Sequence, residues 1–154
     1  MYRVLQPEGL FMFSTFGPDT LHELRQAFLG MDKNNHVNHF IDMHDIGDIL
    51  VHSGFDMPVM DMEYITFTYD DVISVMRELK AMGAHNVLQN RKRGLTGKTG
   101  WGKVLHNYES FRENGKLPVT FELVYGHAWK LEEKRSVRDK NIIEFDPKAR
   151  LTRN

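Results

Sequence analysis

The chain has 154 residues, of which 41% are hydrophobic and 27% are charged, and its formal net charge at pH 7 is −1. That length suffices for one domain with a sizeable core, and the balanced charge gives no general case for binding nucleic acid or an anionic membrane. The sequence has no cysteine, which excludes disulfides and thiolate zinc sites. It contains no apolar run of the roughly 20 residues that span a membrane, and no signal-peptide profile. We therefore expect a cytoplasmic protein that binds neither nucleic acid nor a membrane.

The first elements are a helix end and a strand. Residues 2–6 have the pattern of the last turn of a helix that a proline stops. Residues 10–13 are four consecutive apolar residues without a helical or alternating period, which predicts a strand buried on both faces, as in a parallel sheet covered by helices. Ligands in open α/β sheets bind outside the carboxyl ends of the strands. That rule places Ser14, Phe16 and Gly17 at a candidate binding edge.

Helical and strand patterns alternate through the middle of the chain. A capping-box pattern and an apolar stripe predict a helix from about Thr20 to Leu29. Residues 30–38 form a polar loop, and a second helical stripe ends at Gly54, which has the role of a C-terminal cap. The alternation from Pro58 to Thr68 predicts a strand.

The remaining elements are two helices and a long strand. We expect Asp70 to cap an amphipathic helix, and a further helix with Thr99 as its cap follows a weakly periodic stretch that carries the basic cluster Arg91–Arg93. Alternating apolar residues predict a strand over Val119–Trp129, and the chain is mostly charged from residue 131 onward. The order of elements is that of the second half of an α/β sheet without its first half.

Several segments resemble one known family. The stretch over residues 3–13, Arg-Val-Leu-x-Pro-x-Gly followed by Leu-Phe-Met-Phe, resembles the fifth-strand region of class I S-adenosylmethionine (SAM)-dependent methyltransferases. Four more segments narrow the resemblance to the malonyl-acyl-carrier-protein O-methyltransferases of biotin synthesis (BioC type). They are Ser14–Leu21, Phe40–Gly47, Arg93–Gly97 and Val124–Trp129. The resemblance runs from residue 2 to residue 130 and covers only the C-terminal half of the family.

The fold implied by the resemblance is α/β, the C-terminal part of a class I (Rossmann-like) methyltransferase with about three main strands and helices, lacking the cofactor-binding half. Residues 1–130 are expected to form this substrate-side half, and residues 131–154 a charged extension. We expect the Leu10–Thr15 strand at one edge of the sheet. The Val119–Trp129 strand is expected between it and the Pro58–Thr68 strand, antiparallel to the first.

The sequence also departs from the family. It has no counterpart of the glycine-rich loop after the first strand, nor of the acidic residue after the second strand, that hold the cofactor in such enzymes. SAM is therefore expected as the cofactor of the complete family enzyme, with none bound by this chain alone. Glu8 stands where the family turn commonly has a second glycine, which predicts a tightened or distorted turn.

The resemblance implies methyl transfer from a sulfonium to the free carboxylate of a malonyl thioester. A carboxylate with a pKa of about 4 is already ionised at neutral pH, so the reaction needs no general base, and we assign no catalytic residue. The site has to align the reacting atoms and hold the carboxylate, for which the planar fork of arginine is well suited. The predicted substrate-binding residues are Ser14, Phe16, Gly17, Arg91 and Arg93.

Each candidate also has a simpler explanation. For residues 14–17 the simpler explanation is a purely structural role, as a turn before the start of a helix. The Arg91–Arg93 cluster can hold the malonyl carboxylate, contact an acidic carrier protein, or be a solvated loop. One group has a metal-like composition but lies in a predicted loop, where a polar loop or helix cap is favoured over a metal site; it consists of His36, His39, Asp42 and His44.

Two function classes stay open. The chain can be the substrate-side part of the methyltransferase, active with a separately encoded N-terminal half and acting on an acyl carrier protein. Alternatively, it is a catalytically silent interaction or homodimerisation domain left from a split or truncated methyltransferase. An unpaired edge strand with Phe11 and Phe13 exposed is a surface that proteins normally protect. We therefore predict a homodimer whose interface includes residues 10–28, without methyltransferase activity by itself.

Overall fold

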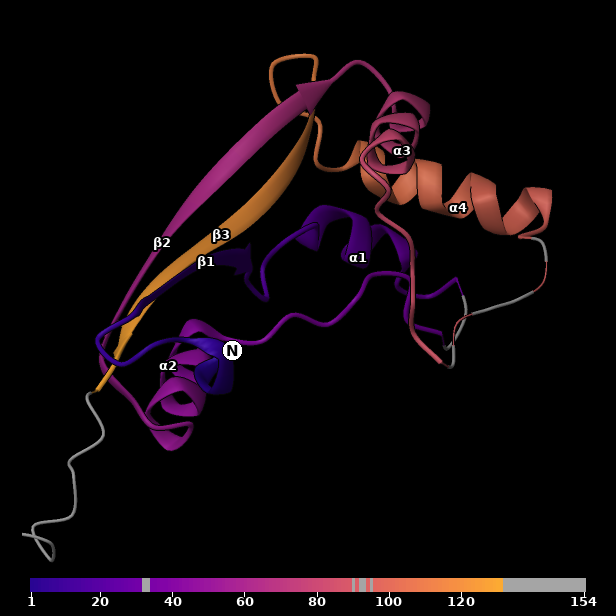
Figure 1. The fold of residues 1–154 in the computed structure, drawn as a ribbon. Helices are drawn as coiled ribbons and strands as arrows, with labels where there is room; N and C mark the ends of the chain where they lie inside the picture. Colours follow the sequence, from indigo (N-terminus) through magenta and orange to yellow (C-terminus); the bar gives the residue numbers. More distant parts are fainter. Residues whose placement is uncertain (32–33, 90, 92–93, 95, 132–154) are drawn as a thin grey trace, which may run out of the picture.

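The computed structural model describes residues 1–31, 34–89, 91, 94 and 96–131. Lys92, Arg93 and the predicted extension from residue 132 onward lie outside the described residues. Over these described residues the structure is α/β, with four α-helices and three strands (Figure 1). In chain order the elements are η1 (Tyr2–Val4), β1 (Leu10–Phe16), α1 (His22–Phe28), α2 (Met43–His52), β2 (Phe55–Tyr69), α3 (Val72–Ala81), α4 (Lys98–Glu109) and β3 (Leu117–Lys130).

The three strands form one sheet in the order β1-β3-β2. β3 is antiparallel to both neighbours, so β1 and β2 run in the same direction. The pairing of β1 with β3 runs from Leu10 opposite Trp129 to Phe16 opposite Leu123. The predicted strand order and the antiparallel central strand are thereby confirmed.

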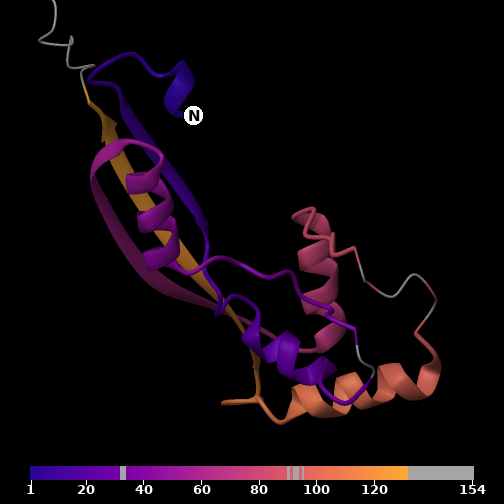
Figure 2. The ribbon, with the colours of Figure 1, turned by 90° about the horizontal axis from the view of Figure 1, so that it is seen from below.

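The helices divide into two groups at opposite ends of the molecule (Figure 2). α2 lies along one face of the sheet, where Leu50, Phe55 and Ala128 form a small buried cluster. α1, α3 and α4 gather around the other end and enclose a larger buried cluster. Within the part of the chain that the structure describes, no helix is long and apolar enough to cross a membrane.

The expectation that β1 is buried on both faces is wrong. Phe11 and Phe13 are half-buried, not exposed, because they point toward the α2 side and stack with ring centroids 5.2 Å apart. Leu10, Met12 and Phe16 point to the other side and are 38%, 69% and 40% exposed. Since side chains alternate along a strand, one covering helix buries only one of the two sets.

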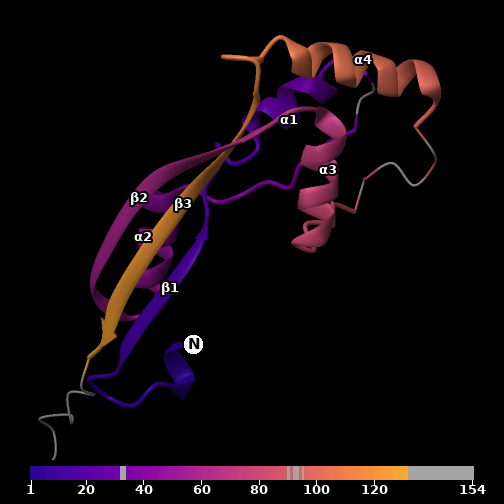
Figure 3. The same ribbon diagram turned by 90° about the horizontal axis from the view of Figure 1, so that it is seen from above.

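The exposed side of the sheet lies away from α2 (Figure 3). We call it the open face and define it by its exposed apolar and aromatic side chains on the three strands. The pairing of Met12 and Val59 with His127, and of Leu10 with Trp129, places these residues on one side of the sheet. The open face includes Leu10, Met12 and Phe16 on β1, Val59 and Phe67 on β2, and Tyr125 and Trp129 on β3.

Several predicted element ends move by a few residues. The predicted N-terminal helix end is a single 3-10 turn, Tyr2–Val4. The side chain that caps α3 is Asp71, not Asp70, and it accepts a hydrogen bond from Ser74 N at 2.8 Å. α4 begins after Gly97 and has no side-chain cap, so Thr99 lies inside the helix.

The turn before β1 has Glu8 in a left-handed backbone conformation, whereas its distortion relative to the family stays a prediction. This residue has a φ of +61°, a conformation that glycine adopts at little cost and other residues rarely adopt. Its backbone N–H donates to Lys130 O at 2.8 Å. The turn is therefore attached to the end of β3, and Glu8 adopts the left-handed backbone that suits the glycine common in the family.

Candidate functional site

The turn that follows β1 is fixed by β3. Gly17 N donates to Glu122 O at 2.9 Å, and Leu21 N donates to Thr120 O at 2.7 Å. A Cβ on Gly17 would lie 2.2 Å from Glu122 Cδ, a distance that real Cβ atoms do not allow. Glycine at position 17 is therefore explained by the close approach of this turn to β3.

The predicted capping box at the start of α1 is wrong, because both of its side chains bind β3. Thr20 Oγ1 donates to Glu122 O at 3.1 Å and accepts from Glu122 N at 3.1 Å. Glu23, only 2% exposed, accepts from Thr120 Oγ1 at 2.5 Å and from Thr120 N at 3.2 Å. A buried carboxylate needs such donors. These bonds attach α1 to the central strand.

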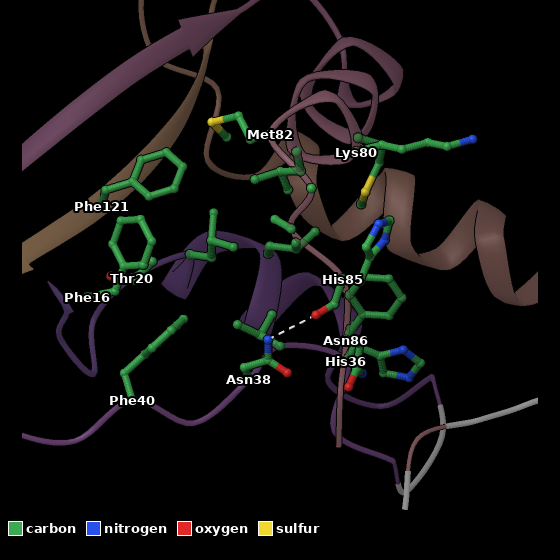
Figure 4. A pocket seen from close by; sticks show the side chains of 18 of the residues that line it. Phe16, Thr20, His36, Asn38, Phe40, Lys80, Met82, His85, Asn86 and Phe121 are labelled. Atoms are coloured by element: carbon green, nitrogen blue, oxygen red, sulfur yellow. Dashed lines mark hydrogen bonds between the residues drawn. The ribbon is translucent and has the colours of Figure 1, made fainter. Parts of the chain in front are cut away.

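A cavity of about 580 Å³ opens beside this turn. It lies between the carboxyl end of β1, the helices α1 and α3, and the two segments that follow those helices (Figure 4). Its size is within the range of small-molecule sites. Most of its lining is apolar, contributed largely by the two helices through Leu24, Phe28, Met76 and Leu79.

One end of the cavity is aromatic. Phe16, at the carboxyl end of β1, has its ring centroid 5.7 Å from that of Phe121 and 5.7 Å from that of Phe40. Figure 4 shows the three rings on the side of the cavity next to the strands. We call Phe16, Phe40 and Phe121 the aromatic end. Phe16 also belongs to the open face, so the open face reaches this end of the cavity.

The opposite side of the cavity is held by asparagines. Asn38 Nδ2 donates to His85 O at 3.0 Å, and Val87 N donates to Asn38 Oδ1 at 3.1 Å. Asn86 Nδ2 donates to Asn35 O at 2.8 Å. The amide of Asn38 thus pairs with the backbone on both sides of Asn86, much as a neighbouring strand would. These bonds fix the segment after α1 against the segment after α3.

The polar lining of the cavity is basic. Lys80 and Arg91 carry the full positive charges, with His36 and His85 beside them. Among the described lining residues none is acidic. In Figure 4, Lys80 and His85 lie across the cavity from Phe16 and Phe121. The cavity therefore suits an elongated ligand with an anionic group.

The structure brings two of the predicted substrate-binding residues to this cavity. Phe16 and Arg91 both line it, although they are far apart in the sequence. Ser14 is exposed on β1 opposite Tyr125, and Gly17 is buried against Glu122. Arg93 lies outside the described residues. None of these placements shows a bound substrate, and the substrate-binding assignment stays a prediction.

Sequence reasoning missed most of the lining. Leu24 and Met76 belong to helical stripes, but a stripe does not distinguish residues that line a cavity from residues of a closed core. Phe121 alternates along a strand in the same way. Asn38 and His85 stand in stretches without periodicity, and no sequence signal indicates that they meet.

The histidine-rich group is spread over separate interactions. His36 stacks on Phe28 with ring centroids 4.1 Å apart, and His39 Nε2 lies 2.8 Å from Asn35 Nδ2. His44 N donates to Asp42 Oδ1 at 2.8 Å, and this backbone hydrogen bond, followed by the His44 side chain, lowers the pKa of Asp42. In the described part of the chain, no three His, Asp or Glu residues are grouped to hold a metal ion.

Comparisons with known proteins give a consistent result. The chain is 67% identical over 137 residues to the malonyl-[acyl-carrier protein] O-methyltransferase of Nitrosospira multiformis, covering 89% of this chain and 45% of that protein. It is 55% identical over 151 residues to the same enzyme of Laribacter hongkongensis, covering 96% of this chain and 51% of that protein. The chain is homologous to malonyl-[acyl-carrier protein] O-methyltransferases. The resemblance found in the sequence is thereby confirmed.

The homology has a defined extent. The chain spans about half the length of these relatives, including the Gallionella capsiferriformans enzyme, of which it covers 45% at 62% identity. No protein-family model matches the chain. A crystal structure of a candidate methyltransferase from Bacillus halodurans C-125 matches with a TM-score of 0.44 and 17% identity, over 85% of this chain and 55% of that one. The family relationship therefore rests on the sequence relatives.

The sequence resemblance implies SAM as the cofactor of the complete family enzyme, and the described residues do not fit this cofactor by themselves. Such a site needs a glycine-rich turn between a strand and a helix. In the described part of the chain, β1 continues into Gly17-Pro18 and β2 into Asp70-Asp71, and neither forms such a turn. Gly100 and Gly102 have the glycine spacing but lie inside α4. The cavity is therefore a candidate substrate site.

Proposed function

We propose that this chain is the substrate-side part of a SAM-dependent carboxyl methyltransferase that acts on malonyl-acyl carrier protein in biotin biosynthesis. The observation that carries the proposal is 67% identity, over 89% of the chain, to a malonyl-[acyl-carrier protein] O-methyltransferase. In this proposal the chain binds and orients the malonyl thioester. A cofactor-binding half has to supply SAM, and the chain alone has no activity.

The sheet supports the finer fold assignment within this proposal. A β1-β3-β2 order with an antiparallel central strand agrees with the C-terminal part of a class I methyltransferase, as the sequence resemblance implies. β1 and β2 run in the same direction, so the carboxyl end of β1 is the edge where such sheets meet their ligands. The aromatic end of the cavity lies at this edge.

The aromatic end suits the reacting carboxylate. Phe16, Phe40 and Phe121 offer an apolar wall that limits access of water, and electrostatic attraction is strong in such surroundings. When bound in the complete enzyme, the sulfonium of the methyl donor would lie beside this carboxylate and would supply the compensating positive charge. The open face continues from Phe16 along β1, which supports the placement of a cofactor-binding half against that face.

A chimera tests the proposal. This chain would replace the matching 137 residues of the Nitrosospira multiformis enzyme, and methyl transfer from labelled SAM to malonyl-acyl carrier protein would be measured. The proposal predicts that the chimera methylates malonyl-acyl carrier protein and leaves acetyl-acyl carrier protein, which has no free carboxylate, unchanged. The 154-residue chain alone should be inactive. A folded chimera that binds SAM but does not transfer methyl groups to malonyl-acyl carrier protein would contradict the proposal.

The open face favours a second candidate, a homodimerisation domain without catalytic activity. Met12 is 69% exposed and Val59 is 51% exposed on a sheet whose β1 edge has one side without a strand partner in the described residues. Two copies that meet through residues 10–28 would cover part of this surface. We propose this homodimer as the state of the chain when no cofactor-binding half is present.

Sedimentation at micromolar concentration tests the homodimer. The chain should sediment as a dimer, and Met12→Lys should shift it toward a monomer because a charge in an apolar interface is costly. The control is Ile73→Lys on α3, an exposed apolar position (46%) away from the open face. A well-folded monomer in the unmodified chain would contradict the homodimer.

A further inference from the structure

The cavity has two chemically different ends, and its chemistry points to an orientation for the substrate. We propose that Lys80, His85 and Arg91, which we call the basic end, bind the phosphate of a phosphopantetheine arm. The acyl group at the other end of the arm then extends toward the aromatic end at β1. This inference rests on the proposed function, because it assumes a substrate carried on such an arm.

The basic end is formed by the C-terminal turn of α3 and the segment that follows it. Lys80 lies in the last turn of α3, and His85 is fixed by the bond of its carbonyl to Asn38 Nδ2, 3.0 Å long. Two further turns lead to Arg91, since Leu88 N donates to Asn86 Oδ1 at 3.0 Å and Arg91 N donates to Leu88 O at 3.2 Å. All three residues line the cavity, and Figure 4 shows the Lys80 side chain extending outward from its edge.

The charges at this end select an anion. Lys80 and Arg91 are both exposed at the rim, where an incoming ligand can reach them, and no acidic side chain lines the cavity among its described residues. Arginine and lysine form charge-assisted hydrogen bonds with phosphate oxygens that are stronger than neutral ones. A phosphate at the rim would therefore gain two cationic partners without competition from a neighbouring carboxylate.

The direction of the ligand follows from the sheet. A malonyl group on a phosphopantetheine arm has an anion at each end, the carboxylate and the phosphate, joined by a long uncharged chain. The carboxylate has to reach the carboxyl end of β1, where the aromatic end lies. Figure 4 places Lys80 and His85 across the cavity from Phe16 and Phe121. The phosphate therefore binds at the basic end. The uncharged arm lies along the apolar lining between the two ends, which includes Leu24 and Leu79.

This orientation decides between the roles that the sequence leaves open for Arg91. It assigns Arg91 to the carrier end of the substrate and not to the malonyl carboxylate. The same orientation gives Lys80, which has no sequence motif around it, a role in distinguishing phosphorylated from unphosphorylated arms.

Calorimetric titration of the full 154-residue chain with 4′-phosphopantetheine and with pantetheine tests the inference. Neither probe carries a malonyl group, so the result does not depend on methyl transfer. We expect 4′-phosphopantetheine to bind at least about 10-fold more tightly than pantetheine at low salt, with the preference decreasing as salt is added. The double variant Lys80→Ala/Arg91→Ala should lose this preference while its affinity for pantetheine stays the same.

The matched control removes two other cations from the neighbouring helices. Arg77 on α3 and Lys103 on α4 are exposed and do not line the cavity, so Arg77→Ala/Lys103→Ala should keep the preference. Equal affinity for the two probes, no measurable binding of either, or a preference that survives in Lys80→Ala/Arg91→Ala would overturn the inference. Inorganic phosphate that binds as tightly as 4′-phosphopantetheine would also overturn it, because it would indicate a simple anion site. The chimera assay can still succeed in each of these cases, so the two proposals fail separately.

Discussion

The two ends of this molecule are packed to different degrees. Around α1, α3 and α4, twelve of the described residues form a continuous buried cluster, and a cavity opens inside this region. At the other end, the cluster beneath the sheet has three buried residues, and the opposite side of the same strands is the open face. The helical end therefore has its own core, whereas the sheet end has apolar surface to cover. This difference supports both proposals, that the cavity binds a substrate and that another polypeptide covers the open face.

The largest effect is expected in the helical end. Leu24 is 5% exposed and lines the cavity, so Leu24→Ala should lower the free energy of unfolding by about 2–5 kcal/mol through lost burial and an enlarged void. Chemical denaturation would measure this loss. Leu29→Ala, at the end of the same helix and 68% exposed, should change the free energy by less than about 0.5 kcal/mol. A loss at position 24 as small as that at position 29 would mean that the helical core is not well packed.

A smaller effect is expected where the sheet packs against α2. Gly126 lies opposite Phe13, and a Cβ added to it would be 2.3 Å from Phe13 Cζ and 2.8 Å from Met60 Sδ. Gly126→Ala should therefore destabilise the chain by about 1–3 kcal/mol through overpacking. Gly102→Ala is the control, because it lies on α4 with no other atom within 4 Å of its added Cβ, and it should stabilise the helix by about 0.5–1 kcal/mol. Thermal unfolding of both variants would show whether the sheet end is as tightly packed as the contacts indicate.

The smallest effect concerns Tyr108 and depends on pH. Its hydroxyl donates to Pro118 O at 2.9 Å, and burial, followed by the nearby Glu23 carboxylate, raises its pKa well above the ordinary value. Because the folded-state pKa is the higher one, the contribution is present below about pH 10 and is lost as the pH rises above the unfolded value. Tyr108→Phe should cost about 0.5–1.5 kcal/mol at neutral pH and should reduce the loss of stability in alkali. Denaturation curves for the unmodified chain and Tyr108→Phe at pH 7 and above pH 10 would check the direction of this pH dependence. If both chains lose the same stability in alkali, the loss comes from other tyrosines.

The same contrast explains what the sequence could predict. The type of each main element follows from strong local patterns, as in the alternation along Val119–Trp129, whereas the strand order and the antiparallel central strand are implied by the family resemblance. The expectations are wrong where a side chain binds residues that are distant in the sequence. Thr20 and Glu23 have the spacing of a capping box, but both bind β3. The burial of residues 10–13 depends on how many helices cover the strand, and a run of apolar residues does not report that number.

The candidate site was predictable only in part for the same reason. Phe16 follows a strand and Arg91 lies in a basic cluster, so both could be selected from local sequence. Asn38 contributes through its bonds to His85 O and Val87 N, and no periodicity predicts such a pairing between two irregular segments. Phe121 looks like an ordinary strand residue until the sheet order places it beside Phe16.

The central claim is that the cavity binds a malonyl thioester with its carboxylate toward β1. A crystal structure of the chimera with malonyl-4′-phosphopantetheine tests this claim most directly. We predict the malonyl carboxylate beside Phe16 and Phe121, the arm along Leu24, and the phosphate within hydrogen-bond distance of Lys80 or Arg91. A ligand bound in the reverse direction, or bound outside the cavity, would contradict the account.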